Sequence, residues 1–239
     1  MSGHSKWATI KRQKGIADKK RGQVFSKLSR EISLAAKNGS DPTMNFRLRL
    51  VLDRAKDAGV PKDVIERAVK RGAGEGQEGQ LEEIVYEGYG PFGTAFLIEA
   101  ATDNKNRTTN NIKHVFSEYG GNLGAQGSVA WQFATRGQIL VERDNRADLS
   151  DLQLVAIDAG AEDVRESPEG LEVYTLPVDL EKIKQVLIAA GAKIAEAQVI
   201  KESSQGVDLT AEQKTKIDEL AQELENDEDV IAVHTSANL

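Results

Sequence analysis

The pattern of apolar residues changes at a glycine-rich segment, residues 72–79, and this change limits the folds open to the chain. The segment reads Gly-Ala-Gly-Glu-Gly-Gln-Glu-Gly, a composition typical of a flexible linker. Before it, apolar residues recur at the three- and four-residue spacing of amphipathic helices. After it, short apolar runs typical of strands alternate with helical patterns. We therefore predict an α+β protein in which residues 73–80 link a helical N-terminal domain, residues 1–72, to an α/β remainder.

Three helices are expected in residues 1–72. The first spans 13–37, with six apolar residues on one face: Val24, Phe25, Leu28, Ile32, Ala35 and Ala36. The second spans 43–58, and the third begins at Pro61, since proline is tolerated in the first turn of a helix. Lysine and arginine residues occupy the other faces of these helices. The sequence therefore predicts a three-helix bundle with a cationic exterior.

Residues 136–204 carry a complete pattern of strand, helix, strand, strand, helix and strand. The strands are expected at 138–142, 162–165, 171–174 and 197–200, and the helices at 148–159 and 179–190. This order is that of the ferredoxin-like split βαβ arrangement. We therefore expect residues 136–204 to form a ferredoxin-like βαββαβ domain.

The segments on either side of that pattern lack partners close in sequence. Strands at 83–87, 94–101 and 129–133 and a helix after residue 103 precede it, and a helix at 210–225 and a strand at 230–234 follow it. Trp131 and Phe133 fall on one face of the strand expected at 129–133. We infer that residues 81–135 and 205–239 form one discontinuous α/β domain, into which the ferredoxin-like domain is inserted.

Charge is divided unevenly along the chain. Residues 1–72 contain 18 Lys and Arg but only 7 Asp and Glu, whereas the other 167 residues hold 13 basic and 31 acidic groups. The net charges are thus +11 and −18, a division that points to a polyanion-binding N-terminal part. The alternative is that the two parts attract each other. The acidic cluster at 223–229 fits no calcium-binding loop and is interpreted as a solvated helix end.

Several functional classes are disfavoured by what the chain lacks. It has no cysteine, which excludes disulfides, thiolate metal sites and cysteine nucleophiles, and a reducing cytoplasm is the expected location. No apolar run approaches the roughly 20 residues that span a bilayer, and no apolar signal region lies near the N-terminus. His4, His114 and His234 do not have metal-ligand spacing. We expect no catalytic residue, no metal, no cofactor and no membrane contact, and hence a protein that is not an enzyme.

The densest positive charge lies in residues 1–30, where nine Lys and Arg stand against a single acid, Asp18. Each phosphate that such residues contact releases condensed counterions, so the segment is suited to bind DNA or RNA with steep salt dependence. Trp7 either stacks on a base or anchors this arm to the bundle. A membrane-surface helix or an organellar targeting segment is the competing interpretation. The predicted nucleic-acid-binding residues are Lys6, Trp7, Lys11, Arg12, Lys14, Lys19, Lys20, Arg21, Lys27 and Arg30.

A second group of candidates lies at a helix start, in the sequence Asp-Asn-Lys-Asn-Arg-Thr of residues 103–108. Lys105 and Arg107 can donate to a phosphate there, together with the backbone N–H groups of the first turn. Ordinary helix capping by Thr102 or Asp103 explains the same residues equally well. We add Lys105 and Arg107 to the predicted nucleic-acid-binding residues.

Aromatic residues near the first expected strands allow two interpretations. Tyr86, Tyr89 and Phe92 can stack on bases, although a place in the core is preferred for Phe92. The glycine-rich stretches at 88–93 and 120–124 are expected to be plain turns rather than phosphate sites.

Motifs spread along the whole chain resemble those of the YebC/PmpR family. They are Met-Ser-Gly-His-Ser-Lys-Trp at 1–7, Lys-Arg-Gly at 20–22, Phe-Ser-Lys-Leu-Ser-Arg-Glu-Ile at 25–32, Asn-Phe-Arg-Leu-Arg at 45–49, Tyr-Glu-Gly-Tyr-Gly-Pro at 86–91, the sequence at 103–108, and the Gly-Gly-Asn-Leu-Gly and Gly-Ser-Val-Ala-Trp runs within 120–131. The resemblance implies a helical N-terminal domain followed by two α/β domains. It also implies a cytoplasmic, non-enzymatic regulator of gene expression, commonly described as a DNA-binding transcriptional regulator. Mitochondrial relatives are described as translational activators, and bacterial ones as ribosome-associated factors that help synthesis past proline-rich stretches.

Two functional hypotheses remain open. The first is duplex DNA binding and transcriptional control, although no pair of helices is expected to combine a short turn with base-reading side chains. The second is an RNA-binding or ribosome-bound translation factor, which a dispersed cationic bundle and the arm aromatic Trp7 fit somewhat better. A pure protein-interaction adaptor would leave the charge of residues 1–72 unexplained. In each case we expect a monomer.

Overall fold

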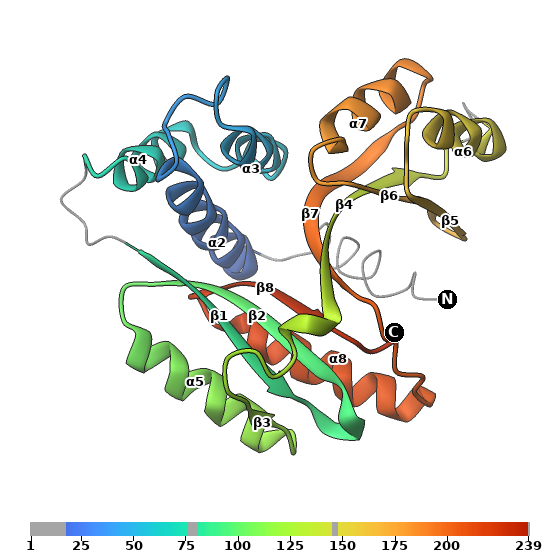
Figure 1. Cartoon of the computed structure of the whole chain (residues 1–239). Helices are drawn as coiled ribbons and strands as arrows, with labels where there is room; N and C mark the ends of the chain where they lie inside the picture. The colour runs from blue at the N-terminus through green and yellow to red at the C-terminus, as the bar shows by residue number, and fades with distance from the viewer. Residues whose placement is uncertain (1–17, 76–80, 145–147, 239) are drawn as a thin grey trace. The chain divides into compact units, whose positions relative to one another are not determined.

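The computed structural model describes residues 18–75, 81–144 and 148–238, with the backbone alone at 18–20 (Figure 1). The described residues divide into two compact units. The smaller spans 133–204, and the larger combines the helical segment with residues 81–132 and 205–238. The smaller unit therefore interrupts the larger one close to the insertion expected from the sequence. The helical segment, expected as a domain of its own, lies in the same compact unit as the discontinuous α/β segment.

Three helices form the bundle among the described residues of the larger unit: α2 (Asp18–Ala36), α3 (Phe46–Asp57) and α4 (Lys62–Gly72). Their apolar faces meet in a single buried cluster, so the expected bundle is confirmed. The members of that cluster with little exposure are Leu28, Ile32, Ala35, Ala36, Leu48, Val51, Ala55, Val60 and Ala68.

Asn45 fixes the start of α3. Its side-chain oxygen accepts the backbone N–H of Leu48 at 3.0 Å, which satisfies a donor that the first helical turn leaves free. Its side-chain amide donates to the carbonyl oxygens of Ala35 at 2.8 Å and Gly39 at 2.7 Å. One residue therefore caps α3 and holds the end of α2 against it.

The sheet of the larger unit has the strand order β3-β1-β2-β8. Its strands are β1 (Glu82–Tyr89), β2 (Ala95–Thr102), β3 (Asn122–Leu123) and β8 (Val230–Thr235), and all neighbours pair antiparallel. Because β8 follows the inserted unit in sequence and pairs with β2, which precedes it, this sheet is built from residues on both sides of the inserted unit.

Helices cover both faces of this sheet. Helices α5 (Lys105–Glu118) and α8 (Ala211–Asn226) lie on one side and α2 on the other (Figure 1). Phe96 of β2 meets Phe116 of α5 edge-on, with ring centroids 5.8 Å apart. Ala101 of the same strand packs with Leu34 of α2. Positions 96 and 101 point to opposite faces of a strand, so both faces of β2 are buried.

The strand expected at 129–133 is wrong. Residues Ala130–Gln132 form a short 3₁₀ helix, η2, and Trp131 is 66% exposed. The cause is the carboxylate of Glu87, which accepts the backbone N–H groups of Gly127 at 2.6 Å and of Val129 and Ala130 at 2.7 Å. These donors are therefore unavailable to a strand ladder, and the next strand starts only at Phe133.

The inserted unit has the ferredoxin-like order predicted from the sequence. Its strands are β4 (Phe133–Glu142), β5 (Asp163–Ser167), β6 (Gly170–Thr175) and β7 (Ile194–Ser203), and its helices are α6 (Leu149–Asp158) and α7 (Leu180–Ala189). The sheet order is β5-β6-β4-β7, with every neighbouring pair antiparallel. A side chain at Gly170, where φ is 152°, would stand 1.9 Å from the carbonyl oxygen of Val141, so the β5–β6 turn requires glycine.

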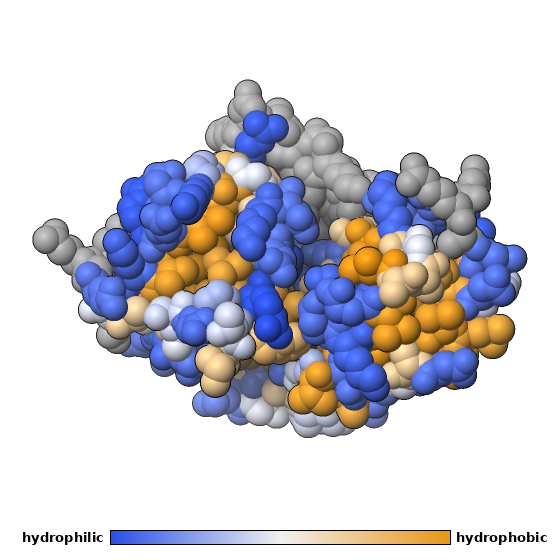
Figure 2. Space-filling view, turned by 90° about the horizontal axis from the view of Figure 1, so that it is seen from above, coloured by the Kyte–Doolittle hydropathy of each residue, from blue (hydrophilic) through white to orange (hydrophobic). Residues whose placement is uncertain are grey.

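Apolar side chains both fill and cover the inserted unit. Ile139, Val141, Leu171 and Val173 are fully buried in the sheet. Others are exposed: Leu154, Ile157, Leu176, Val178, Val186 and Ile188. Figure 2 shows that hydrophobic residues reach the surface on the face of the molecule seen there.

Candidate nucleic-acid interface

Seven of the predicted nucleic-acid-binding side chains lie outside the described residues: those of Lys6, Trp7, Lys11, Arg12, Lys14, Lys19 and Lys20. Their roles stay predictions. Arg21 is exposed near the start of α2. The remaining candidates are Lys27 and Arg30 on α2 and Lys105 and Arg107 on α5, and each of these has a defined position.

Lys27 and Arg30 face the acidic C-terminal segment rather than the outer surface. Arg30 lies 3.0 Å from the carboxylate of Asp229 and donates to the carbonyl oxygen of Ala101 at 3.1 Å. The Lys27 ammonium donates to the carbonyl oxygen of Glu225. Burial lowers the pKa of Lys27, against the opposing effect of the charge on Glu225. The expectation that both cations belong to the outer face is therefore corrected: attraction between the basic and acidic parts of the chain occupies them.

Asp229 is the centre of that attraction. It is 2% exposed, and it accepts from Arg107 at 2.6 Å and from the hydroxyl of Thr108 at 2.7 Å. Burial acts to raise the pKa of Asp229, but the hydrogen bonds from Arg107 and Thr108 and the charge of Arg30 outweigh it and lower the pKa. The carboxylate is thus held ionised inside the protein. The expectation of a solvated acidic cluster is wrong for this residue.

The start of α5 is built mainly by capping. The side chain of Asn104 accepts the backbone N–H of Arg107 at 3.1 Å, and the Arg107 guanidinium also donates to Asp103 at 3.0 Å. The Arg107 side chain is still 46% exposed. Lys105 is exposed, and its ammonium has no ion pair with another described residue. Of the two candidates at this helix start, Lys105 is therefore the more available to a phosphate.

Several cations of the described bundle have an acidic partner within the unit. The pairs are Arg47 with Glu83 at 2.6 Å, Arg54 with Glu31 at 2.8 Å, Arg67 with Asp63 at 3.0 Å, Lys56 with Asp53 at 3.2 Å and Lys62 with Glu66 at 3.6 Å. The exposed pairs among them contribute at most about 1 kcal/mol each. The unbalanced positive charge of the N-terminal part is therefore concentrated near its beginning.

A short turn joins α3 to α4. Only residues 58–61 separate the two helices, and Gly59 adopts a φ of 74°, a conformation that glycine takes at low cost. A turn of this length is typical of helix-turn-helix units. Of the two features that the sequence was expected to lack for such a unit, a short turn and base-reading side chains, the short turn is therefore present. Base-reading side chains are still not evident, because Asp63 and Glu66 alternate with the cations on α4.

The structure decides between the two interpretations for Tyr86 and overturns the expectation for Phe92. Tyr86 is 7% exposed, whereas Phe92, expected in the core, is 42% exposed at the β1–β2 turn. Trp131 is 66% exposed, and its indole N–H is satisfied by the carbonyl oxygen of Ser128 at 3.1 Å. The apolar alternation of residues 129–133 placed Trp131 in a strand, so its exposure on a loop was not expected. Both exposed rings are available for contact.

Two further features concern ligands and membranes. In residues 18–75, 81–144 and 148–238, no group of three or more His, Cys, Asp and Glu side chains is arranged to hold a metal ion. His114 pairs with Glu118 at 3.5 Å and His234 with Glu99 at 3.2 Å. Within the same residues, no helix is long and apolar enough to cross a membrane.

The chain matches two family models that together cover nearly all of it. Residues 5–75 match the model of the TACO1/YebC protein N-terminal domain, and residues 81–237 match that of the TACO1/YebC second and third domain. The boundary between the two matches falls at the glycine-rich linker.

Similar proteins have been named in several bacteria. A probable transcriptional regulatory protein of Thermoanaerobacter pseudethanolicus is 45% identical over 240 residues, covering 100% of this chain and 98% of its own. Another, from Desulfosudis oleivorans, is 48% identical, covering 100% and 97%. The crystal structure of a conserved hypothetical protein from Aquifex aeolicus superposes with a TM-score of 0.87 at 41% identity, covering 98% and 96% of the two chains.

Proposed function

The chain belongs to the TACO1/YebC family, and from this premise we propose that it is a non-enzymatic, nucleic-acid-binding regulator of gene expression. The observation that carries the proposal is the charge of residues 1–21, which hold seven Lys and Arg against one Asp. Since Lys27 and Arg30 are engaged by the acidic C-terminal segment, this first stretch is the main source of charge for phosphate contacts.

Duplex DNA is the first candidate partner. It is supported by the name of the relatives, probable transcriptional regulatory protein, and by the short turn between α3 and α4. In helix-turn-helix proteins the second helix enters the major groove, a role that would fall to α4. Ion pairs on this helix, such as that of Arg67 with Asp63, would have to break before the cations could contact the DNA.

RNA on the ribosome is the second candidate partner, which would make the protein a translation factor, including one that assists synthesis through proline-rich stretches. The observation that favours it is the exposure of Trp131 and Phe92, at 66% and 42%. Aromatic rings stack on unpaired bases, which RNA loops present and duplex DNA does not. We also propose that the protein acts as a monomer in the cytoplasm, without a cofactor.

The salt dependence of binding tests the shared part of both candidates. Replacing Lys11, Arg12, Lys19 and Lys20 together with glutamine should weaken binding and reduce the slope of log K against log salt by about 3 to 4, since each phosphate contact contributes about 0.7 to 0.9. The matched control removes four lysines of the inserted unit: Lys182, Lys184, Lys193 and Lys201. Equal slopes for the two variants would contradict the proposal.

Crosslinking in cells separates the two candidates. The full-length protein is crosslinked mildly, isolated, and its bound nucleic acid is sequenced. Promoter DNA without ribosomal RNA would end the translation hypothesis, and ribosomal RNA without promoter DNA would end the transcriptional one.

A further inference from the structure

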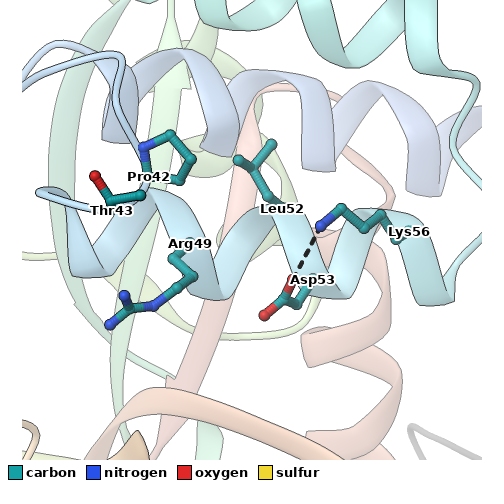
Figure 3. Close-up of a pocket in the computed structure, with 6 residues that line it drawn as sticks. All are labelled: Pro42, Thr43, Arg49, Leu52, Asp53 and Lys56. Atoms are coloured by element: carbon teal, nitrogen blue, oxygen red, sulfur yellow. Dashed lines mark hydrogen bonds and ion pairs between the residues drawn. The ribbon is translucent and has the colours of Figure 1, made fainter.

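A pocket of about 230 Å³ opens on the surface of α3, beside the short segment that precedes the helix (Figure 3). Its floor is largely apolar, and charged side chains stand around it. The residues that line it are Pro42, Thr43, Arg49, Leu52, Asp53 and Lys56. No part of the nucleic-acid interface described above includes this pocket.

Arg49 differs from four other described arginines of the bundle. Arg30, Arg47, Arg54 and Arg67 each pair with a carboxylate. Arg49 has no ion pair or hydrogen bond with any described residue, and its Nε atom is buried without an acceptor. A buried donor left unsatisfied destabilises the fold, and more so when it is charged. Such groups are rare in native proteins and call for an explanation.

The Arg49 guanidinium is held in place although it lacks a partner. Its central carbon lies 5.7 Å from the centre of the Phe46 ring, which is within the range of a cation–π contact. Figure 3 shows the guanidinium projecting away from the pair that Lys56 forms with Asp53 at 3.2 Å. The three charged residues of the pocket sum to +1, so an anion meets a small positive excess here.

We propose that this pocket binds a phosphate group of a nucleotide, with Arg49 as its main ligand and Pro42 and Leu52 as the apolar wall for the adjoining sugar. The planar fork of arginine matches the oxygens of a phosphate, and the Arg49 side chain lines the pocket without an ion pair to any described residue. The inference rests on the proposed nucleic-acid binding and adds a phosphate site on α3, separate from residues 1–21.

Side-chain NMR of the full chain detects the contact directly. Uridine monophosphate should shift the Nε–H resonance of Arg49 and leave that of Arg67 in place, since Arg67 is exposed and paired with Asp63. Inorganic phosphate should shift the same resonance at higher concentration, because it lacks the sugar. If sodium acetate shifts Arg49 as strongly as uridine monophosphate does, the site takes any anion and the nucleotide assignment is overturned.

Binding to a single-stranded oligouridylate tests the site in nucleic acid. Arg49→Gln should weaken binding by about tenfold, the loss expected for one charge-assisted hydrogen bond, and Arg49→Lys by less, because it keeps the charge without the fork. The control Arg67→Gln should change binding by no more than about twofold. Equal losses in Arg49→Gln and Arg67→Gln would overturn the pocket as a specific site.

The outcome also separates this inference from the function on which it rests. If the glutamine variant at Lys11, Arg12, Lys19 and Lys20 weakens binding while Arg49→Gln does not, the pocket is wrong and the proposed function stands. If neither variant weakens binding, the proposed function itself is overturned. Circular dichroism should show an unchanged fold for Arg49→Gln, since no described residue depends on its hydrogen bonds.

Discussion

Glu87 and Asp229 are two ionised carboxylates buried in the larger unit, where they are 4% and 2% exposed. For each, burial acts to raise the pKa, and the surrounding donors outweigh it and lower the pKa. Glu87 is surrounded by three backbone N–H groups, and Asp229 by side chains from α2 and α5. The first carboxylate therefore shapes the loop that presents Trp131, and the second ties the bundle to the sheet.

Asp229→Asn should destabilise the larger unit by roughly 2–4 kcal/mol, because it leaves Arg30 and Arg107 without their shared carboxylate. Chemical denaturation followed by tryptophan fluorescence measures the loss. The control is Asp103→Asn, which removes a carboxylate from the same Arg107 at a site that is 48% exposed. That exposed change should cost no more than about 1 kcal/mol. Equal costs would show that burial of the Asp229 pair contributes little.

Glu87→Gln should destabilise the protein by roughly 2–3 kcal/mol at neutral pH, because an amide NH2 replaces one of the two carboxylate oxygens and leaves at least one backbone N–H without its acceptor. The loss should shrink in acid. A carboxyl group whose pKa is lowered by folding stabilises the protein above its ordinary pKa of 4.5, and this contribution disappears as the pH falls through the folded-state pKa. Urea midpoints measured from neutral to acidic pH should therefore converge for the two proteins. A constant gap would argue against this origin.

At the scale of elements, Asn45 joins two helices that lie next to each other in sequence. Asn45→Ala removes the cap of α3 and both bonds to the end of α2, so a loss of roughly 2–3 kcal/mol is expected. Asp148→Ala is the matched control, since Asp148 caps α6 through one bond, to Ser150 at 2.8 Å, and should cost about 1 kcal/mol. Thermal or urea unfolding measures both, and a smaller loss at Asn45 than at Asp148 would refute the dual role.

Elements were predictable where their signal is local. The alternation of strands and helices in residues 136–204 follows from side-chain periodicity within each segment, and the observed sheet order agrees with it. The strand expected at 129–133 failed because its apolar residues alternate correctly while its N–H groups belong to Glu87, some 40 residues earlier. A pattern within five residues contains no trace of that acceptor.

At the scale of the whole molecule, the larger unit is built from two segments on either side of the inserted unit. The folding of each of these segments therefore depends on the other. Removing residues 205–239 deletes α8 and β8, whose side chains Ile217, Leu220 and Val230 are fully buried. We expect the larger unit to unfold, because the deletion would expose the edge of β2 and the sheet face that α8 covers. The inserted unit should keep its dispersed NMR signals, since residues 133–204 form a compact unit of their own. Retention of the signals of β1 and β2 would contradict this view.

The sequence by itself determined the helical bundle, the ferredoxin-like pattern, the insertion and the concentration of positive charge near the N-terminus. These follow from periodicity, turn composition and charge counts, which are properties of consecutive residues. Only the tertiary structure decided which cations remain available to a partner. In the sequence, Lys27, Arg30 and Arg107 looked equivalent to other basic residues. In the structure, Arg30 and Arg107 pair with Asp229, about 120 to 200 positions away, and Lys27 donates to the carbonyl oxygen of Glu225. Charge pairing acts through space over a few ångströms, so the partners become known only once the chain has brought them together.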